Sequence, residues 1–443
     1  MIESVNRRKF IKMTSAAGLG LGVMGNSASV LGSQFQNSKI NVAIMGVNSR
    51  GSALAKGFAE NPLADVSYIC DVDDQAIKKG IQAVKDGGQT REPKGVKDFR
   101  EALDDQSVDA IVIACPIHWH APASILALKA GKHVYVEKPC SHNIHEGELL
   151  VAAADKYKRV VQMGNQRRSW PNVMDAINQL REGAIGNTYY ARCWYANTRG
   201  SIGYGKPAPV PTNLDYDLWQ GPAPRQAYLD NKIHYNWHWH WHWGAGELLN
   251  NGTHFIDLAR WGLGVSYPQR VTSSGGRYHW KDDQETPDTQ VVTYDFPEGK
   301  SVTWEARSCN SRGIEGSSTG VSFHGENGTL IVDGNGYVIY DNDNKEVKSS
   351  KSGSTNAIDT TGPGFNLDRD HQTNFIESIH NGKKPNSDIT EGNVSVHTCH
   401  LGNIAHRTQR MINCDPHNGQ IIGDMEAKKL VRREYEPGWE PTL

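Results

Sequence analysis

Residues 40–51 read INVAIMGVNSRG, and this stretch decides the fold. Its first half is a continuous apolar run typical of a buried strand, and its second half is a turn bounded by Gly46 and Gly51 that opens a helix. With the spacing GxGxxG, such a turn lets backbone N–H groups and the positive helix end approach a pyrophosphate. Asn48 replaces the middle glycine, and asparagine tolerates left-handed backbone angles better than most residues. The stretch predicts a strand, a phosphate-binding turn and a helix that continues to about Glu60.

One acidic residue adds to the evidence from this turn. Asp71 follows the next apolar run, residues 64–70, and lies twenty positions after Gly51. A carboxylate at this place accepts a hydrogen bond from a ribose 2′-hydroxyl, and it would repel a 2′-phosphate. We therefore expect the turn to bind NAD, with NADP disfavoured, although the turn pattern alone also fits an ordinary glycine turn.

Apolar runs and helical stretches continue to alternate beyond this point. Strands are predicted at residues 108–114, 133–136 and 160–163, with a helix at 121–130. The alternation is typical of βαβ units and of a parallel sheet. Residues 39–165 are therefore predicted to form a Rossmann dinucleotide-binding domain.

The second half of the chain has a different pattern. Several stretches alternate with period two between Gly, Asn and Pro residues, which predicts an open, mostly antiparallel sheet with one covered face. These stretches are Thr188–Tyr195, Val291–Phe296, Ser301–Ala306 and Thr329–Val332. A loop is expected at 341–365, and helices are expected at 371–379 and 395–411. Residues 166–443 are thus predicted to be an α/β domain for substrate binding. Its free sheet face would lie against the first domain or against a second subunit, and we expect a homodimer or homotetramer through this open sheet.

Length and composition narrow the class of protein. The 443 residues exceed the ~250–300 at which one core usually divides, so two domains fit the length. A net charge of -2 provides no field that would gather nucleic acid or an anionic membrane surface. Twelve Trp and sixteen Tyr suit aromatic platforms for a sugar. The seven cysteines are odd in number and lack CxxC spacing, so we interpret most of them as buried small hydrophobic residues.

The N-terminus has the pattern of a targeting segment. Residues 6–12 read NRRKFIK and closely match the twin-arginine export pattern. The apolar stretch from Met13 to Met24 is too short to span a bilayer, and Ser27-Ala28-Ser29 is a weak cleavage neighbourhood. We expect a signal peptide and linker at 1–38 and a periplasmic protein without a stable membrane span. The alternative is a frayed N-terminus with a chance pair of arginines.

Glu137-Lys138-Pro139 follows the strand predicted at 133–136, at the carboxyl edge where open α/β sheets bind ligands. With the turn at 46–51 and Cys115-Pro116-Ile117-His118-Trp119-His120, it resembles the Gfo/Idh/MocA oxidoreductase family, in which this lysine lies beside the nicotinamide and the substrate. Further matches extend the resemblance to nearly the whole chain after the N-terminal segment. They are Gly164-Asn165-Gln166-Arg167-Arg168, Asp217-Leu218-Trp219-Gln220-Gly221-Pro222, Gly252-Thr253-His254-Phe255-Ile256-Asp257, and the C-terminal Asn374-Phe375, Gly382-Lys383-Lys384-Pro385 and Asn403-Ile404-Ala405.

The resemblance implies three sets of site residues and no metal. Lys138 and His254 are the expected catalytic residues. The expected cofactor-binding residues are Gly46, Asn48, Ser49, Arg50, Gly51, Asp71, Pro116, His118, His120, Glu137, Lys138 and Gln166. The expected substrate-binding residues are Arg167, Trp219, His240, Asn250, His254 and Asp257.

His254 and Asp257 are three residues apart, so on one helical turn the carboxylate could hold the tautomer and orientation of the imidazole. Relatives commonly carry an aspartate four residues before this histidine. Here that position is Asn250, which cannot act as a base, so the proton transfer is expected to fall to His254 and Lys138. A structural histidine whose hydrogen bonds are satisfied within a helix is the alternative.

Residues 234–243 read HYNWHWHWHW and stand out in the sequence. If this segment is extended, period two puts four tryptophans on one face and His238, His240 and His242 on the other. A substrate wall of rings and imidazoles and a packed aromatic strand at a subunit contact both fit the pattern. A metal could use such an HxH pair, but no third ligand is evident.

These features together predict an exported enzyme with tightly bound NAD that acts on a carbohydrate or cyclitol. Lys138 or His254 would take the hydroxyl proton while the hydride moves to the nicotinamide, and the charge of Lys138 would steady the alkoxide. An NAD-dependent glycosidase that oxidises, eliminates and reduces again is the alternative enzyme. A non-catalytic sugar-binding protein is a third possibility, but it would have little need of Lys138.

Overall fold

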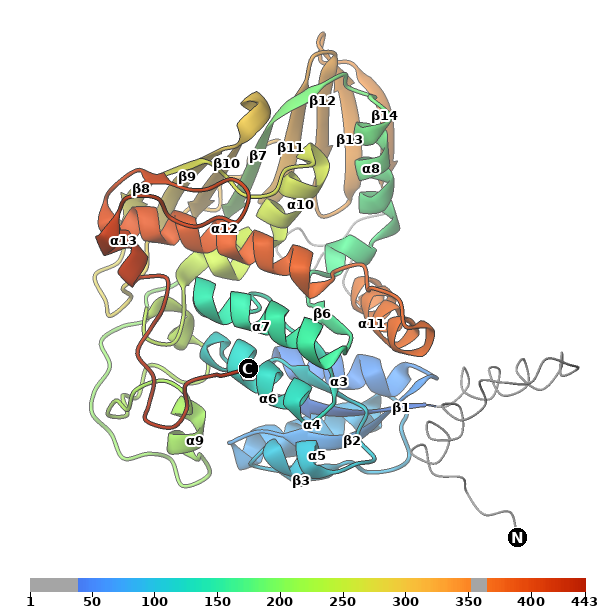
Figure 1. The fold of residues 1–443 in the computed structure, drawn as a ribbon, viewed down its shortest axis with the longest axis vertical. Coiled ribbons are helices and arrows are strands. Elements are labelled where there is room, and N and C mark those ends of the chain that lie inside the picture. Colours follow the sequence, from blue (N-terminus) through green and yellow to red (C-terminus); the bar gives the residue numbers. More distant parts are fainter. Residues whose placement is uncertain (1–38, 352–364) are drawn as a thin grey trace, which may run out of the picture. The chain divides into compact units, whose positions relative to one another are not determined.

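The apolar runs of the first half form a six-stranded parallel sheet in the computed structural model, which describes residues 39–351 and 365–443 (Figure 1). Its strand order is β3-β2-β1-β4-β5-β6, and every neighbouring pair is parallel. The strands are β1 (Ile40–Met45), β2 (Ala64–Cys70), β3 (Lys94–Val96), β4 (Ala110–Ile113), β5 (His133–Val136) and β6 (Val161–Met163). This order confirms the predicted Rossmann fold. The export signal predicted at 1–38 lies outside the described residues.

Both faces of this sheet are buried, as expected for parallel strands between helices. In β1 the side chains of Val42 and Ile44 enter one apolar cluster, while those of Ala43 and Met45 enter the other. Helices α3 and α4 pack against each other, as do α6 and α7. The helices of this half are α3 (Arg50–Glu60), α4 (Asp74–Asp86), α5 (Arg100–Asp104), α6 (His120–Lys129) and α7 (Ile144–Tyr157).

Late segments of the chain return to this first half. Helix α11 (Phe365–Asn381) packs on α3, and the ring of Phe375 lies edge-on to Phe58 and Tyr135, with centroid distances of 6.4 and 5.8 Å. Near the C-terminus, Trp439 packs against Trp119 at 5.3 Å. The core of the first half is therefore completed by residues from the end of the chain.

The second sheet has nine strands in the order β14-β13-β12-β11-β7-β10-β9-β8-β15. Among the strands of the described residues, only β7 and β10 of this sheet pair in parallel, so the sheet is mixed and mostly antiparallel, as predicted. Its strands are β7 (Thr188–Ala196), β8 (Arg270–Gly276), β9 (Thr289–Asp295), β10 (Ser301–Arg307), β11 (Thr319–Gly325), β12 (Gly328–Val332), β13 (Gly336–Asp341), β14 (Glu346–Lys351) and β15 (Ile412–Asn413). The loop predicted at 341–365 is wrong for residues 346–351, which form β14, and residues 352–364 lie outside the described part.

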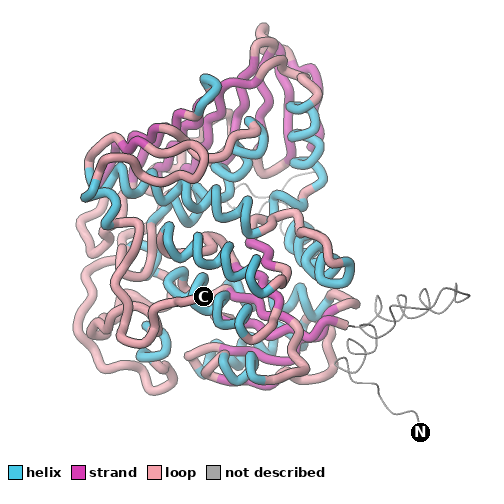
Figure 2. The backbone as a smooth tube through the Cα atoms, viewed as in Figure 1, coloured by secondary structure: helices cyan, strands magenta, loops and turns pink. Residues whose placement is uncertain are grey.

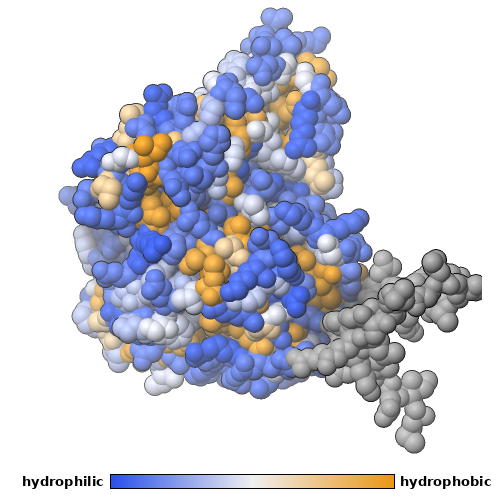
Figure 3. All heavy atoms as spheres, viewed as in Figure 1, coloured by the Kyte–Doolittle hydropathy of each residue, from blue (hydrophilic) through white to orange (hydrophobic). Residues whose placement is uncertain are grey.

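Helices α8 (Pro171–Arg181), α10 (Thr253–Leu263) and α12 (Ile389–Thr408) pack on one face of this sheet (Figure 1). The other face presents half-buried side chains, such as Thr303 and Glu305 of β10. Helix α13 (Met425–Lys429) contacts α12 near the C-terminus. The surface in view is mostly hydrophilic with smaller apolar areas (Figure 3).

Residues 197–247 connect β7 to the helical region around α10 and are mostly loop, with the short helix α9 (Tyr216–Gln220) (Figure 2). We call them the cover segment. Backbone and ring contacts hold this segment against the first sheet, for example the Trp119 indole N–H that donates to the Trp219 carbonyl at 3.1 Å.

Among residues 39–351 and 365–443, the helices fall short of the length and apolarity needed to cross a membrane. All seven cysteines lie in these ranges, and none is paired in a disulfide. Five of them are buried, which agrees with their interpretation as small hydrophobic residues.

Candidate active site

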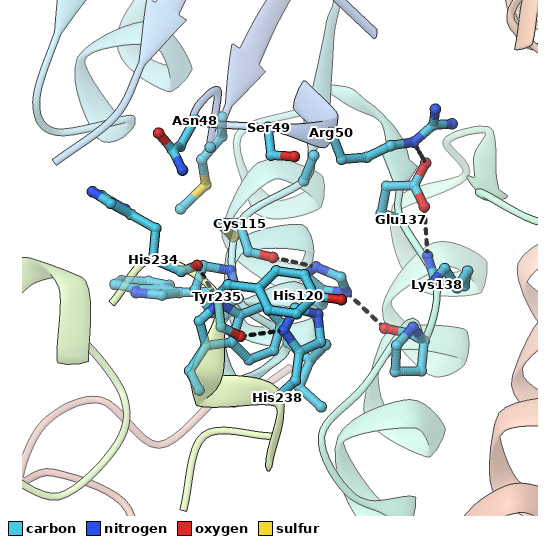
Figure 4. A pocket seen from close by; sticks show the side chains of 18 of the residues that line it. Asn48, Ser49, Arg50, Cys115, His120, Glu137, Lys138, His234, Tyr235 and His238 are labelled. Atoms are coloured by element: carbon cyan, nitrogen blue, oxygen red, sulfur yellow. Dashed lines mark hydrogen bonds and ion pairs between the residues drawn. The ribbon is translucent and has the colours of Figure 1, made fainter. Parts of the chain in front are cut away.

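A cavity of about 300 Å³ lies where the carboxyl ends of β1, β2, β4 and β5 meet the cover segment and α10 (Figure 4). This edge of the sheet is where ligands of open α/β folds bind. The predicted site residues that line the cavity are Gly46, Asn48, Ser49, Arg50, Asp71, Pro116, His120, Glu137, Lys138, Gln166, Trp219, Asn250 and His254. The structure thus brings most of the predicted cofactor residues and both predicted catalytic residues to one cavity.

The turn after β1 depends on its two glycines. Gly46 has a φ of +82°, and a Cβ there would lie 2.5 Å from the backbone nitrogen of Cys115. A Cβ on Gly51 would collide with the carbonyl of Gly46. Asn48 is not among the residues with positive φ, so the turn does not use the left-handed tolerance that we expected of asparagine there. Gly51 packs against the backbone of the turn and does not line the cavity.

Asp71 lies at the end of β2 and faces the cavity. Its carboxylate accepts backbone N–H bonds from Val47 at 2.7 Å and Asp73 at 3.1 Å. Burial raises the pKa of Asp71, and these two hydrogen bonds act in the opposite direction. The carboxylate is therefore fixed beside the turn, at the place where a ribose hydroxyl would donate to it.

Arg50 and Glu137 line the cavity, and each forms an ion pair with another residue of the protein. The Nε of Arg50 donates to Glu137 at 2.9 Å, and its two terminal nitrogens donate to Asp368 of α11 at 2.6 Å. Burial alone would raise the pKa of Glu137, yet Arg50 and Lys138 hold it below its ordinary value. Gln166 also donates to Glu137, at 3.0 Å. We conclude that this network stiffens one cavity wall, beside Lys138.

Lys138 lies just after β5, and its side chain reaches the turn that directly precedes α10. Its Nζ donates to the backbone carbonyl of Asn250 at 2.7 Å and to the Asn250 side-chain oxygen at 3.2 Å. Burial lowers the pKa of Lys138 to about 8, against the opposing effect of Glu137. An amine with this pKa can both accept and donate a proton near neutral pH.

His254 stands in the first turn of α10 and lines the same cavity. Its Nδ1 is buried and has no hydrogen-bond partner among the described residues. Burial and the nearby charge of Lys138 hold the pKa of His254 well below its ordinary value, so the ring is neutral at pH 7. A neutral imidazole here can exchange a hydrogen bond with a substrate hydroxyl.

The expected contact between Asp257 and His254 is wrong. The two oxygens of Asp257 accept from Arg168 at 2.7 and 2.8 Å, and Oδ1 also accepts from Ser395 at 2.7 Å. Asp257, which was expected to bind substrate, does not line the cavity. Asp257 and His254 do lie one helical turn apart on α10. Both oxygens of Asp257 nevertheless bond the buried guanidinium of Arg168, because a buried carboxylate needs a charged partner.

Three other expected ligand-binding residues lie behind the cavity wall. The Nε2 of His118 meets the carbonyl of Trp219 at 2.9 Å. The guanidinium of Arg167 is buried and lies over the ring of Phe255 at 5.1 Å. His240 is buried beside Glu285 at 3.5 Å. All three are absent from the cavity lining and serve the packing around it.

The run at 234–243 is not an extended strand. Asn236–Trp239 forms a 3₁₀ turn and residues 241–243 form another turn, so the expected division into two faces is wrong. Among the described residues, no group of three or more His, Cys, Asp or Glu is placed to hold a metal ion. The run instead bends so that Trp237 and His238 line the cavity with Tyr235.

Several residues line the cavity that were not among the expected site residues. His234 lines the cavity, and its Nε2 bonds the carboxylate of Asp73 at 2.9 Å across 161 residues of sequence. Figure 4 shows His234 and Glu137 on opposite sides of the view, with Tyr235 between them. The other lining residues outside the expected sets include Lys97, Phe99, Leu218, Gly246 and Leu249. They come from distant segments, so only the fold brings them together.

Family models match both halves of the chain. The model described as "Oxidoreductase family, NAD-binding Rossmann fold" matches residues 24–165, and the model described as "Oxidoreductase family, C-terminal alpha/beta domain" matches residues 192–441.

Curated relatives carry the name "Glycosyl hydrolase family 109 protein". The relative from Saccharopolyspora erythraea is 29% identical over 253 residues, which are 51% of this chain and 55% of the relative. That from Parabacteroides distasonis is 25% identical over 336 residues, 70% of each chain. The chain thus spans about half the length of the first of these relatives.

Solved structures share the fold. Levoglucosan dehydrogenase in complex with NADH and levoglucosan has a TM-score of 0.66 at 19% identity, covering 85% of this chain and 99% of that one. The aldose-aldose oxidoreductase from Caulobacter crescentus, complexed with glycerol, has a TM-score of 0.64 at 18% identity over the same shares.

Proposed function

The chain belongs to the Gfo/Idh/MocA oxidoreductase family, and we propose that it is an enzyme that moves a hydride between NAD and a secondary hydroxyl carbon of a sugar, glycoside or cyclitol. The observation that carries this proposal is the position of Lys138. Its amine shares one cavity with the nucleotide-binding turn and with His254, and its pKa of about 8 suits proton transfer.

The described residues fit NAD. Gly46 and the start of α3 offer the close backbone approach that a pyrophosphate needs. Asp71 offers an acceptor for a ribose hydroxyl, and its negative charge would repel a 2′-phosphate. NAD supplies the acceptor for the hydride when it is bound. The wall formed by Arg50 and Glu137 would hold Lys138 at the reacting end of the cavity.

In the oxidation direction Lys138 takes the proton of the substrate hydroxyl. It must be neutral to do so, and burial makes that form available at mildly alkaline pH. The neutral ring of His254 orients the same hydroxyl by a hydrogen bond. In the reverse direction the ammonium of Lys138 returns the proton and stabilises the negative oxygen.

The substrate class is argued from the cavity and the relatives. Trp219, Trp237 and Tyr235 line the cavity and offer rings on which a sugar face can pack. Solved relatives named for levoglucosan and aldoses support a carbohydrate.

A second function is favoured by the curated relatives named as glycosyl hydrolases. In a redox-neutral glycosidase, the same proton acceptor would serve a transient oxidation, which is followed by loss of the aglycone, addition of water and return of the hydride. Lys138 is needed in both enzymes, whereas a non-catalytic sugar-binding protein would have little use for it.

One experiment separates these functions. The nucleotide is released from purified protein and identified, and the protein is assayed on a panel of glycosides, sugars and cyclitols for aglycone release and for nicotinamide absorbance. Accumulated reduced nucleotide indicates a dehydrogenase, and aglycone release without net reduction indicates a glycosidase. Absence of any nicotinamide nucleotide and of affinity for added NAD would contradict both.

The proposal extends to location and assembly. The twin-arginine pattern at residues 6–12 supports export to the periplasm, where free NAD is scarce, so the nucleotide would remain tightly bound between turnovers. The face of the second sheet that α8, α10 and α12 leave uncovered supports a homo-oligomer through that face.

A further inference from the structure

Behind Lys138 lies a short series of buried polar groups. Lys138 donates to both oxygens of Asn250, and the side-chain nitrogen of Asn250 faces a carboxylate oxygen of Glu247 at 3.4 Å. Asn251 donates to that same oxygen. Asn250 and Asn251 belong to a π-helical turn at Leu248–Gly252, and such turns often occur at functional sites.

The amide of Asn250 lies between an ammonium and a carboxylate. An amide has an acceptor end and a donor end, so only one of its two orientations suits both neighbours. The oxygen must face Lys138 and the nitrogen must face Glu247, as observed. Glu247 therefore determines that an acceptor, and not a donor, is presented to the amine.

Glu247 is itself firmly held. Its side chain is 2% exposed, and Arg199 donates to its two oxygens at 2.8 and 3.3 Å. Arg199 also donates to the hydroxyl of Tyr235, which lines the cavity, at 2.9 Å. A buried carboxylate with this many donors is held in one place.

We infer that Glu247 is a positioning residue of this site, which fixes the Asn250 amide against Lys138 and supplies through it the negative charge that the amine faces. The inference rests on the proposed role of Lys138. Glu247 does not reach the cavity itself, since it is not among the lining residues. It acts through Asn250, a neutral residue that separates the two charges.

Other charged groups also shift the pKa of Lys138, and they determine how far loss of the Glu247 charge can change it. Glu137 and Glu247 raise the pKa of Lys138, while Arg50 and Arg199 lower it. The charged and titratable groups around the amine are Glu137, Arg50, Glu247, Arg199, His120, His238 and His254. The three histidines have pKa values below their ordinary value and are neutral above pH 7. Removal of the Glu247 charge therefore leaves Arg199 and Arg50 to favour the neutral amine.

The test measures the titration of Lys138 directly and needs no substrate. The full-length protein is labelled with trace acetic anhydride across a pH series, and acylation of Lys138 is followed by peptide mass spectrometry. Glu247→Gln should lower the midpoint by about half to one pH unit. Asn250→Asp, which puts a carboxylate beside the amine, should raise it. Glu305→Gln on the second sheet is the matched control, because Glu305 pairs with Arg192 away from the cavity and should leave the midpoint unchanged.

An unchanged or raised midpoint in Glu247→Gln would overturn the inference, provided that thermal unfolding shows a folded protein. If that variant does not fold, Asn250→Leu decides, because it removes the amide that Glu247 is inferred to hold against the amine. It should lower the midpoint, and an unchanged midpoint there overturns the inference. The midpoint is independent of any reaction, so failure of the proposed function would appear separately, as a turnover that does not follow the titration of Lys138.

Discussion

The lowered pKa of Lys138 makes a quantitative prediction for the pH dependence of turnover. With a pKa of about 8, the neutral fraction of the amine is about 1% at pH 6 and one half at pH 8. If Lys138 accepts the proton, the oxidation rate should rise about fifty-fold over this range and level off above about pH 9. An ordinary exposed lysine would instead give a rise that continues toward pH 10.

The assay is single-turnover formation of reduced nicotinamide on a verified substrate, at constant ionic strength from pH 6 to 10. Lys138→Ala should lower the rate about 10²–10⁴-fold and remove the acid limb, while bound nucleotide stays in place. His254→Ala should lower the rate about 10²-fold and leave the midpoint near 8, because the His254 ring is neutral over the whole range.

A wild-type rate that keeps rising beyond pH 9 would refute the reasoning, since it would show that burial does not shift Lys138. A flat profile from pH 6 to 8 would mean that Lys138 does not accept the proton. Near-wild-type rates in both alanine variants would remove these residues from the chemistry.

Further predictions concern the nucleotide, the fold and export. Asp71→Ala should weaken NAD binding and improve NADP binding in titrations with each nucleotide, and a wild type that prefers NADP would contradict the role of Asp71. Asp257→Ala leaves Arg168 buried without its carboxylate, so the free energy of unfolding should fall by about 3–5 kcal/mol. An unchanged unfolding midpoint would contradict this view of Asp257 as a structural residue. Replacement of Arg7 and Arg8 by Lys should keep uncleaved protein in the cytoplasm, and normal appearance in the periplasm would show that the segment is no twin-arginine signal.

The first sheet could be predicted because its signals are local. The predicted apolar runs of β1, β2 and β5 have the same bounds as the observed strands. The reason is that a parallel strand buried on both faces needs an unbroken apolar run. Strand β14 could not be predicted, because EVKSSK is polar and exposed, and pairing with β13 alone makes it a strand.

Only those site residues that belong to a short sequence motif could be predicted. The turn at Gly46 and the amine of Lys138 follow from short patterns beside strands. The partner of Asp257 did not follow, because Arg168 lies 89 residues away and competes with a histidine one turn along the helix. Likewise nothing near Asp73 indicates that His234 will reach it.

The return of α11 to the first sheet has a consequence for synthesis of the chain on the ribosome. Phe58 and Tyr135 are translated early, but Phe375, which covers both, emerges more than two hundred residues later. Until then the nascent nucleotide-binding half has an open apolar face. We expect a fragment that ends near residue 165 to keep that face exposed, and therefore to aggregate or to require a chaperone unless α11 is supplied with it.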